Sequence, residues 1–279
     1  MIIPPSIPML MFAMVSGVSV GKLFMAGLIP GILIGATQLI ITWSISAKKG
    51  YHKFQTKQTF SENKKVAKDG ILAILMPIMI LITVTMGVCT ASESAGIAVL
   101  YALILGTVIY KELTIKDIKS SLKKTAMITA SIMIIGGFTM IFTWILAMEQ
   151  IPTMLANFIL TSNIPYWVIL VLFDILILIL GTFLDVVPCI LLIAPILMPV
   201  MQAIGMSELQ FGIIIVVGLA IGLVTPPVGM CLNVAAKISG LSIIEVFKNA
   251  IPFLICNVII LLLVTFVPAI SLWLPKLLF

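Results

Sequence analysis

Long apolar runs dominate this chain, and their length is the feature that most restricts its fold. A helix needs about 20 predominantly apolar residues to cross the hydrocarbon core of a lipid bilayer. Runs of about this length cover residues 22–46, 70–89, 93–110, 125–147 and 251–275, and a shorter apolar piece covers 7–15. Of the 279 residues, 62% are hydrophobic and only 9% are charged, far from the composition of a soluble domain. We therefore expect an all-α, polytopic membrane protein that contacts the lipid bilayer, and no water-soluble enzyme.

The basic residues are all lysines, and they indicate how the helices are oriented. The segment 47–69 has seven lysines against two acidic residues, a net charge of +5, and the segment 111–124 has five against two, a net charge of +3. Lysine-rich loops usually face the cytoplasm, so both are expected there. This role accounts for the net charge of +6 without a nucleic-acid partner.

A glycine- and proline-containing interruption at 181–188 divides the apolar region 164–203. Such a break inside a membrane is tolerated where protein or a water-filled cavity covers it. If 164–203 is a re-entrant hairpin on the outer face and 209–239 crosses inward, Lys237 and Lys248 reach the cytoplasm. We therefore expect a re-entrant hairpin.

Two segments, 3–24 and 224–247, repeat one pattern. The matches are Pro4-Pro5 with Pro226-Pro227, Ser-Gly-x-Ser at 16–19 with the same motif at 239–242, and Phe24 with Phe247. Because the predicted topology places the two Ser-Gly-x-Ser motifs on opposite sides of the membrane, the copies form an inverted repeat, an architecture typical of secondary transporters. A proline, Pro30 or Pro252, is then expected to open or break the next helix of each copy.

The two copies differ in what precedes them. Only three residues stand before Pro4, whereas the hairpin and a half-helix precede the second proline pair. We expect either a truncated start or another polypeptide that supplies the missing half.

Paired prolines predict a helix broken inside the membrane. They lack two backbone donors and disfavour helical geometry in the preceding residue. One half-helix is expected to end over 222–225, and the next is expected to begin near Val228. Freed carbonyls and the Thr225 hydroxyl are oxygen ligands suited to Na⁺, while the N-terminus of a half-helix offers N–H groups to an anion. A plain proline kink is the alternative.

Several motifs resemble the large membrane subunit of tripartite ATP-independent periplasmic (TRAP) transporters, the DctM-like permease. They are PPS at 4–6, GVCTASESAG at 87–96, GTFLD at 181–185, APILMP at 194–199 and GLVTPPVG at 222–229. The resemblance runs along essentially the whole chain and corresponds to the C-terminal two-thirds of a typical member. It implies an elevator-type fold of the ion-transporter superfamily.

The resemblance also implies a function. It implies symport of Na⁺ with an organic anion such as a C4-dicarboxylate, sialic acid or another sugar acid. Two partners follow from it, a small membrane subunit and a periplasmic substrate-binding protein. No organic cofactor and no catalytic residue are expected.

The domains and site residues can be placed on this chain. The expected parts are the end of the first inverted repeat at 1–46, a basic cytoplasmic loop at 47–69, scaffold and arm helices at 70–163, the transport-domain hairpin and broken helix at 164–239, and a terminal scaffold span at 240–279. The resemblance implies one Na⁺ site, largely of backbone oxygens, at Gly181, Gly222, Thr225 and Val228, and a pseudo-symmetric site at Ile3, Pro5 and Ser6. Candidates for substrate contact are Thr182, Asp185, Pro226, Pro227, Gly229 and Asn233.

Two acidic residues have competing interpretations, and a third has a structural one. Asp185 either faces a cavity or caps the returning hairpin helix. Asp174 belongs either to an ion path or to a pair with a hydroxyl or a lysine. Glu93 is interpreted as part of a capping box that begins at Thr90.

Other functions stay open at this point. One is an ion-coupled anion transporter of the same superfamily that needs no binding protein, and another is an inactive, truncated scaffold fragment. An intramembrane enzyme is disfavoured because no GxSxG with a histidine, no HExxH and no known catalytic aspartate context is present.

Overall fold

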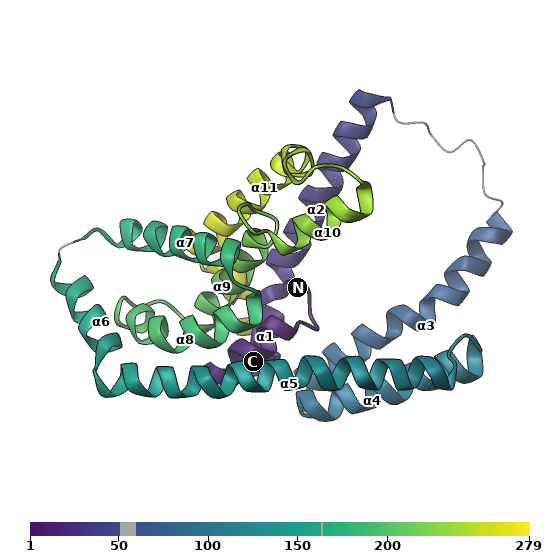
Figure 1. Cartoon of the computed structure of the whole chain (residues 1–279), viewed down its shortest axis with the longest axis horizontal. Coiled ribbons are helices and arrows are strands. Elements are labelled where there is room, and N and C mark those ends of the chain that lie inside the picture. The colour runs from purple at the N-terminus through teal and green to yellow at the C-terminus, as the bar shows by residue number, and fades with distance from the viewer. Residues whose placement is uncertain (51–59, 163) are drawn as a thin grey trace. The chain divides into compact units, whose positions relative to one another are not determined.

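The computed structural model describes residues 1–50, 60–162 and 164–279, and every element in them is a helix. The chain forms two compact units. Unit 1 consists of Met1–Ile41 and Ser131–Phe279, and unit 2 consists of Thr42–Ala130. Two helices run from one unit into the other, α2 (Val20–Lys49) and α5 (Ile115–Met148) (Figure 1). Residues 51–59 of the predicted basic loop lie outside the described residues.

Unit 2 is built on the pairing of two helices. Its elements are α3 (Phe60–Thr85), α4 (Ala91–Ile104) and a π-helical turn, η1 (Leu105–Ile109). The Thr83 and Ser94 hydroxyls are 2.9 Å apart, which joins α3 to α4. The predicted capping box is confirmed, since Thr90 and Glu93 exchange hydrogen bonds at the start of α4.

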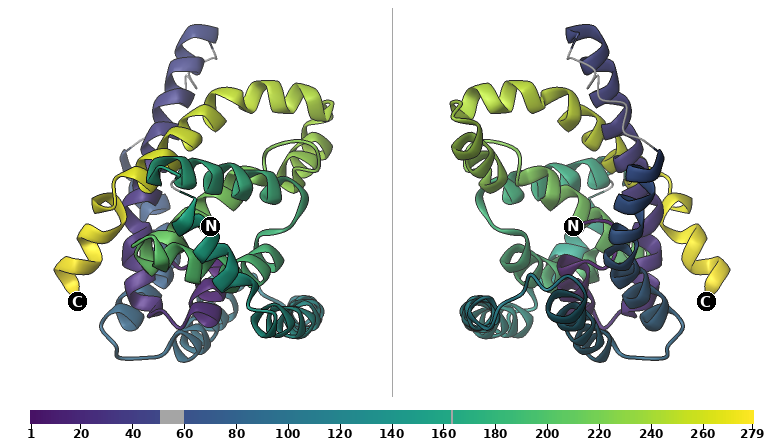
Figure 2. Two further views of the ribbon diagram at one scale, coloured as in Figure 1. Left: turned by 90° about the vertical axis from the view of Figure 1, so that its left-hand side faces the viewer. Right: turned by 90° about the vertical axis from the view of Figure 1, so that its right-hand side faces the viewer.

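Unit 1 is arranged around one central helix, α9 (Glu208–Gly222). The other elements of the unit are α1 (Ile7–Ser16), α6 (Ile151–Thr161), α7 (Tyr166–Phe183), α8 (Val186–Ala203), α10 (Met230–Ser239), α11 (Ile243–Phe266) and α12 (Ala269–Leu278). Five of them pack on α9, namely α1, α7, α8, α11 and α12 (Figures 1 and 2). The sequence of α9 explains this position, because it is apolar on all sides and nearly all of its residues are buried.

An aromatic cluster joins three of the helices of unit 1. The Phe211 ring of α9 stacks on Phe173 of α7, with centroids 5.3 Å apart, and meets Phe12 of α1 edge-on at 5.8 Å. Gly212 leaves room for the Phe12 ring, which would lie 2.6 Å from a Cβ at that position. The helices α1, α7 and α9 thus share one packed core.

The two copies of the predicted repeat have the same local structure. Each proline pair is followed by a ten-residue helix, α1 or α10. Each of these helices ends at a glycine in the left-handed region, Gly17 with φ 74° or Gly240 with φ 70°, a conformation that glycine adopts without steric cost. A long helix, α2 or α11, then follows.

The expectation that a proline opens or breaks that long helix is wrong. Pro30 lies inside α2 and Pro252 lies inside α11, and both helices continue through them. A proline is tolerated inside a membrane helix because neighbouring groups and local adjustments of the helix satisfy the freed carbonyl.

The predicted span over 251–275 is also corrected. The helix α11 begins earlier, at Ile243, where Ser242 and Glu245 form a capping box, and it ends at Phe266. The ring of Pro268 and its missing N–H end the helix there, and α12 begins just after it. Hydropathy alone missed both ends, since Glu245, Lys248 and Asn249 interrupt the apolar run near the start of the helix and the proline lies within an apolar run.

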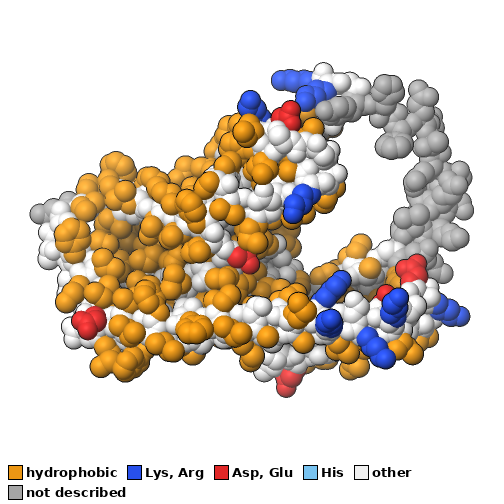
Figure 3. Space-filling model, viewed as in Figure 1, with side chains coloured by type: hydrophobic (Ala, Val, Ile, Leu, Met, Phe, Trp, Pro, Cys, Tyr) orange, Lys and Arg blue, Asp and Glu red, His pale blue; other side chains and the backbone are white. Residues whose placement is uncertain are grey.

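The exposed surface is that of a membrane protein. Among the described residues, six helices are long and apolar enough to cross a membrane. The helix α5 has no buried residue, and Phe138 and Met140 on it are each 72% exposed. Hydrophobic side chains predominate on the face of unit 1 seen in Figure 3. Apolar surface of this extent indicates contact with lipid or with other apolar partners.

A backbone contact between two glycines fixes α7 against α9. A Cβ on Gly222 would lie 2.4 Å from the carbonyl carbon of Gly181 and 2.5 Å from its Cα. A Cβ on Gly181 would lie 3.1 Å from the Cα of Leu219. The atoms that face Gly222 belong to the backbone, so no side-chain rotation can make room for a larger residue.

Substitution of Gly222 by Ala should therefore destabilise the chain by about 1–3 kcal/mol, the usual cost of overpacking. The matched control is Gly137→Ala in α5, where no atom lies within 4 Å of the added Cβ and the change should be neutral or stabilising. Thermal unfolding of both purified variants in detergent checks the prediction. Equal melting temperatures for the two variants would contradict it.

Candidate functional site

The break between α9 and α10 keeps most of its backbone hydrogen bonds. The Thr225 amide donates to the Gly222 carbonyl at 2.9 Å, and the Cys231 amide donates to the Leu223 carbonyl at 3.1 Å. The Thr225 hydroxyl donates to the carbonyl of Ile221 at 2.9 Å. Among the described residues, no hydrogen bond reaches the Thr225 carbonyl oxygen. The break therefore holds hydroxyl and carbonyl oxygens that keep lone pairs for a cation.

The tip of the α7–α8 hairpin is short, only Leu184 and Asp185. Thr182 is buried, and its hydroxyl donates to the Ile179 carbonyl at 2.7 Å. Asp185 is the N-cap of α8, where its Oδ1 accepts from the Val186 amide at 2.8 Å. The capping interpretation of Asp185 is thus confirmed. The tip is brought to the break by the contact of Gly181 with Gly222.

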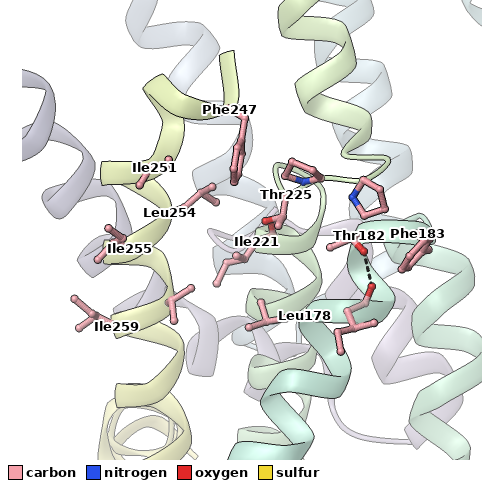
Figure 4. A pocket seen from close by; sticks show the side chains of 14 residues that line it. Leu178, Thr182, Phe183, Ile221, Thr225, Phe247, Ile251, Leu254, Ile255 and Ile259 are labelled. Atoms are coloured by element: carbon pink, nitrogen blue, oxygen red, sulfur yellow. Dashed lines mark hydrogen bonds between the residues drawn. The ribbon is translucent and has the colours of Figure 1, made fainter. Parts of the chain in front are cut away.

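A cavity of about 660 Å³ lies between α7, the break and α11 (Figure 4). The hydroxyl-bearing residues in its wall are Thr182 from the hairpin and Thr225 from the break, and among the described residues no charged side chain lines it. The two prolines of the break line it as well. Its walls are otherwise apolar, formed by Leu178, Ile179, Phe183, Ile221, Phe247, Ile251, Leu254, Ile255, Val258 and Ile259.

The predicted substrate residues divide into two groups. Thr182, Pro226 and Pro227 line the cavity, whereas Asp185, Gly229 and Asn233 do not. The Asn233 side-chain amide donates to the Val228 carbonyl at 2.7 Å, so it stabilises the start of α10. One predicted ion ligand, the Val228 carbonyl, is therefore already hydrogen-bonded and has one lone pair left.

The first proline pair has its own set of contacts. Ser6 is buried and caps α1, where its Oγ accepts from the Met9 amide at 3.4 Å. The same hydroxyl donates to the carbonyl of Met1. Ile3 packs against α2, within reach of Gly31. The three predicted ligands of the pseudo-symmetric ion site therefore lie together in the segment that leads into α1.

The wall contributed by α11 was not predicted. Its residues Phe247, Ile251, Ile255 and Ile259 follow one another at intervals of four, so they occupy one face of the helix. That spacing is visible in the sequence. It does not distinguish a cavity wall from a lipid-facing or packed surface, however.

Comparison with known proteins identifies a family that matches most of the chain. Residues 1–270 match the family model of the DctM component of the tripartite ATP-independent periplasmic transporter. The sialic acid TRAP transporter large permease protein SiaM of Vibrio cholerae is 36% identical over 276 residues, which cover 99% of this chain and 64% of that protein.

Two further relatives have similar coverage. The C4-dicarboxylate TRAP transporter large permease protein DctM of Rhodobacter capsulatus is 33% identical, covering 99% of this chain and 66% of that protein. The 2,3-diketo-L-gulonate TRAP transporter large permease protein YiaN of Escherichia coli is 32% identical, covering 96% of this chain and 63% of that protein. The chain thus spans slightly less than two thirds of the length of these relatives. With a family match along almost its whole length, this polytopic membrane chain belongs to the DctM family of TRAP transporter components.

Proposed function

We propose that the chain acts as the large permease subunit of a Na⁺-coupled TRAP transporter and imports an organic anion by an elevator movement. The observation that carries the proposal is the contact of the hairpin tip with the helix break at Gly181 and Gly222, beside a cavity that both segments line. Two interrupted helical elements that meet at a cavity are the usual way in which secondary transporters build a substrate and ion site.

The oxygen atoms at the break support Na⁺ as the coupling ion. The Thr225 hydroxyl uses its proton toward the Ile221 carbonyl, so its lone pairs are free to face a cation. Carbonyl oxygens of 181, 222 and 228 would complete the proposed set of ligands. Hydroxyl and carbonyl oxygens are hard ligands, which hard cations prefer.

The substrate is proposed to be a carboxylate-containing anion. The relatives are named for sialic acid, C4-dicarboxylates and 2,3-diketo-L-gulonate, and all of these are organic acids. Because this sequence has no arginine, none of its own side chains can bind the carboxylate by a bidentate guanidinium contact. The hydroxyls of Thr182 and Thr225 and backbone N–H groups at the helix termini are the proposed donors.

The proposed setting is the bacterial inner membrane, with a small membrane subunit and a periplasmic binding protein as partners. The binding protein would deliver the anion, and the permease would supply the coupling to Na⁺. This division of roles accounts for a cavity with few polar groups, since selection among anions can then occur before the anion reaches the cavity.

Removal of the Thr225 hydroxyl should weaken Na⁺ binding. We expect Thr225→Val to lower the affinity about tenfold, a change of about 1.4 kcal/mol, while Thr225→Ser retains it. The control is Thr37→Val in α2, whose hydroxyl also donates to carbonyls of its own helix but lies outside the break. Equilibrium binding of radioactive Na⁺ to the purified variants measures the effect. Equal affinities for Thr225→Val and Thr37→Val would exclude Thr225 as a ligand.

Uptake should require both the Na⁺ gradient and the binding protein. Proteoliposomes that contain the chain and the small membrane subunit should accumulate labelled sialic acid or C4-dicarboxylate only with inward Na⁺ and added binding protein. Uptake without the binding protein would favour the alternative function, an ion-coupled anion transporter of the same superfamily that needs no binding protein. The absence of uptake in the complete system would favour an inactive scaffold.

A further inference from the structure

Asp174 is the one acidic side chain that is buried among the described residues, with 3% of its surface exposed. It lies in the middle of α7, a helix long and apolar enough to span the membrane. A carboxyl group at such a position is energetically costly and usually has a function. Neither the proposed Na⁺ site nor the proposed substrate site uses it.

Thr265 of α11 is the only hydrogen-bonding partner of Asp174 in the described part of the chain. The Asp174 Oδ1 atom lies 3.1 Å from the Thr265 hydroxyl oxygen, so the predicted pairing with a hydroxyl is confirmed. The other carboxyl oxygen, Oδ2, is buried and has no hydrogen-bond partner. Gln210 lies close by but donates to the Val264 and Thr265 carbonyls, at 3.0 and 2.9 Å.

The protonation state of Asp174 determines how many hydrogen bonds the Asp174–Thr265 pair can form. The Thr265 hydroxyl oxygen is 2.9 Å from the Leu261 carbonyl as well as 3.1 Å from Asp174, yet a hydroxyl has a single proton. If Asp174 is ionised, both acceptors must share that proton. If Asp174 is a neutral acid, its own O–H donates to Thr265 and Thr265 donates to Leu261, so both contacts become hydrogen bonds.

Among the residues that the structure describes, no opposite charge is paired with Asp174. The helices packed against α7 are α8, α9 and α11. Their titratable groups, together with the other such group of α7, are Cys189, Glu208, Glu245, Lys248, Cys256 and Tyr166. None of these side chains is hydrogen-bonded or ion-paired to Asp174 in the described chain. An ionised carboxylate without an opposite charge is strongly unfavourable in such a place, whereas a neutral acid tolerates an Oδ2 that accepts no bond.

We propose that Asp174 is a proton-binding site within unit 1. In the structure its carboxyl group carries a proton on Oδ1, and this proton joins α7 to α11 through Thr265. The ligand is a proton taken from water. It returns to water when α7 and α11 separate, because the ionised carboxylate is then hydrated.

Infrared spectroscopy of the purified chain in lipid nanodiscs at neutral pH tests the proposal. The wild type should show the carbonyl band of a protonated carboxyl group, and the band should be lost in Asp174→Asn. The control Asp117→Asn, at an exposed acid of α5, should retain it. A wild-type spectrum without the band, or an unchanged band in Asp174→Asn, would overturn the proposal.

Two further measurements separate proton binding from a structural role. Thr265→Val should shift the band to higher frequency, because the acid loses its acceptor, and an unmoved band would count against the pair. Since the protonated form stabilises the α7–α11 contact, the melting temperature of the wild type should fall as the pH rises. The side chain of Asp174→Asn is a neutral donor, so the melting temperature of this variant should not fall as the pH rises. An equal fall of the melting temperature in both proteins would contradict the proposal.

Discussion

The backbone contact between Gly181 and Gly222 is the interaction on which the candidate site depends. It brings the end of α7 against the end of α9 with no side chain between them. Thr182 follows the first glycine directly, and Thr225 lies three residues after the second. Glycine packing therefore sets the distance between the two hydroxyl-bearing segments. The cavity that they line lies beside this contact, which would be lost if α7 and α9 moved apart.

Local hydrogen bonds allow these breaks to exist within an apolar unit. An unpaired backbone group is costly in a membrane, and each interruption satisfies most of its groups from nearby. Asp185 caps α8, Ser6 caps α1, and Asn233 donates to the Val228 carbonyl. At the break, the Thr225 carbonyl accepts no hydrogen bond from the described residues and the Thr225 hydroxyl keeps its lone pairs, so the proposed Na⁺ would use these oxygens without disturbing the helices.

Much of this arrangement was visible in the sequence, because its determinants are local. The proline pairs, the Ser-Gly-x-Ser motifs and the interruption after Gly181 predicted the broken helices and the hairpin. The end of α11 at Phe266 was missed, since Pro268 lies in an apolar run that hydropathy treats as continuous. The contact of Gly181 with Gly222 could not be predicted from local signals, because it depends on how helices distant in the sequence pack.

Both polar features of unit 1 avoid a net buried charge when no Na⁺ is bound. The proposed Na⁺ ligands are neutral oxygens, so an empty ion site leaves no charge in a medium of low polarity. The proposed proton on Asp174 does the same for the one acid that is buried among the described residues, and it does so through one hydroxyl of α11. The elevator movement proposed above would therefore move unit 1 without an unpaired buried charge whenever its ion site is empty. The central helix α9, against which α7 and α11 both pack, is the surface on which these two features are held.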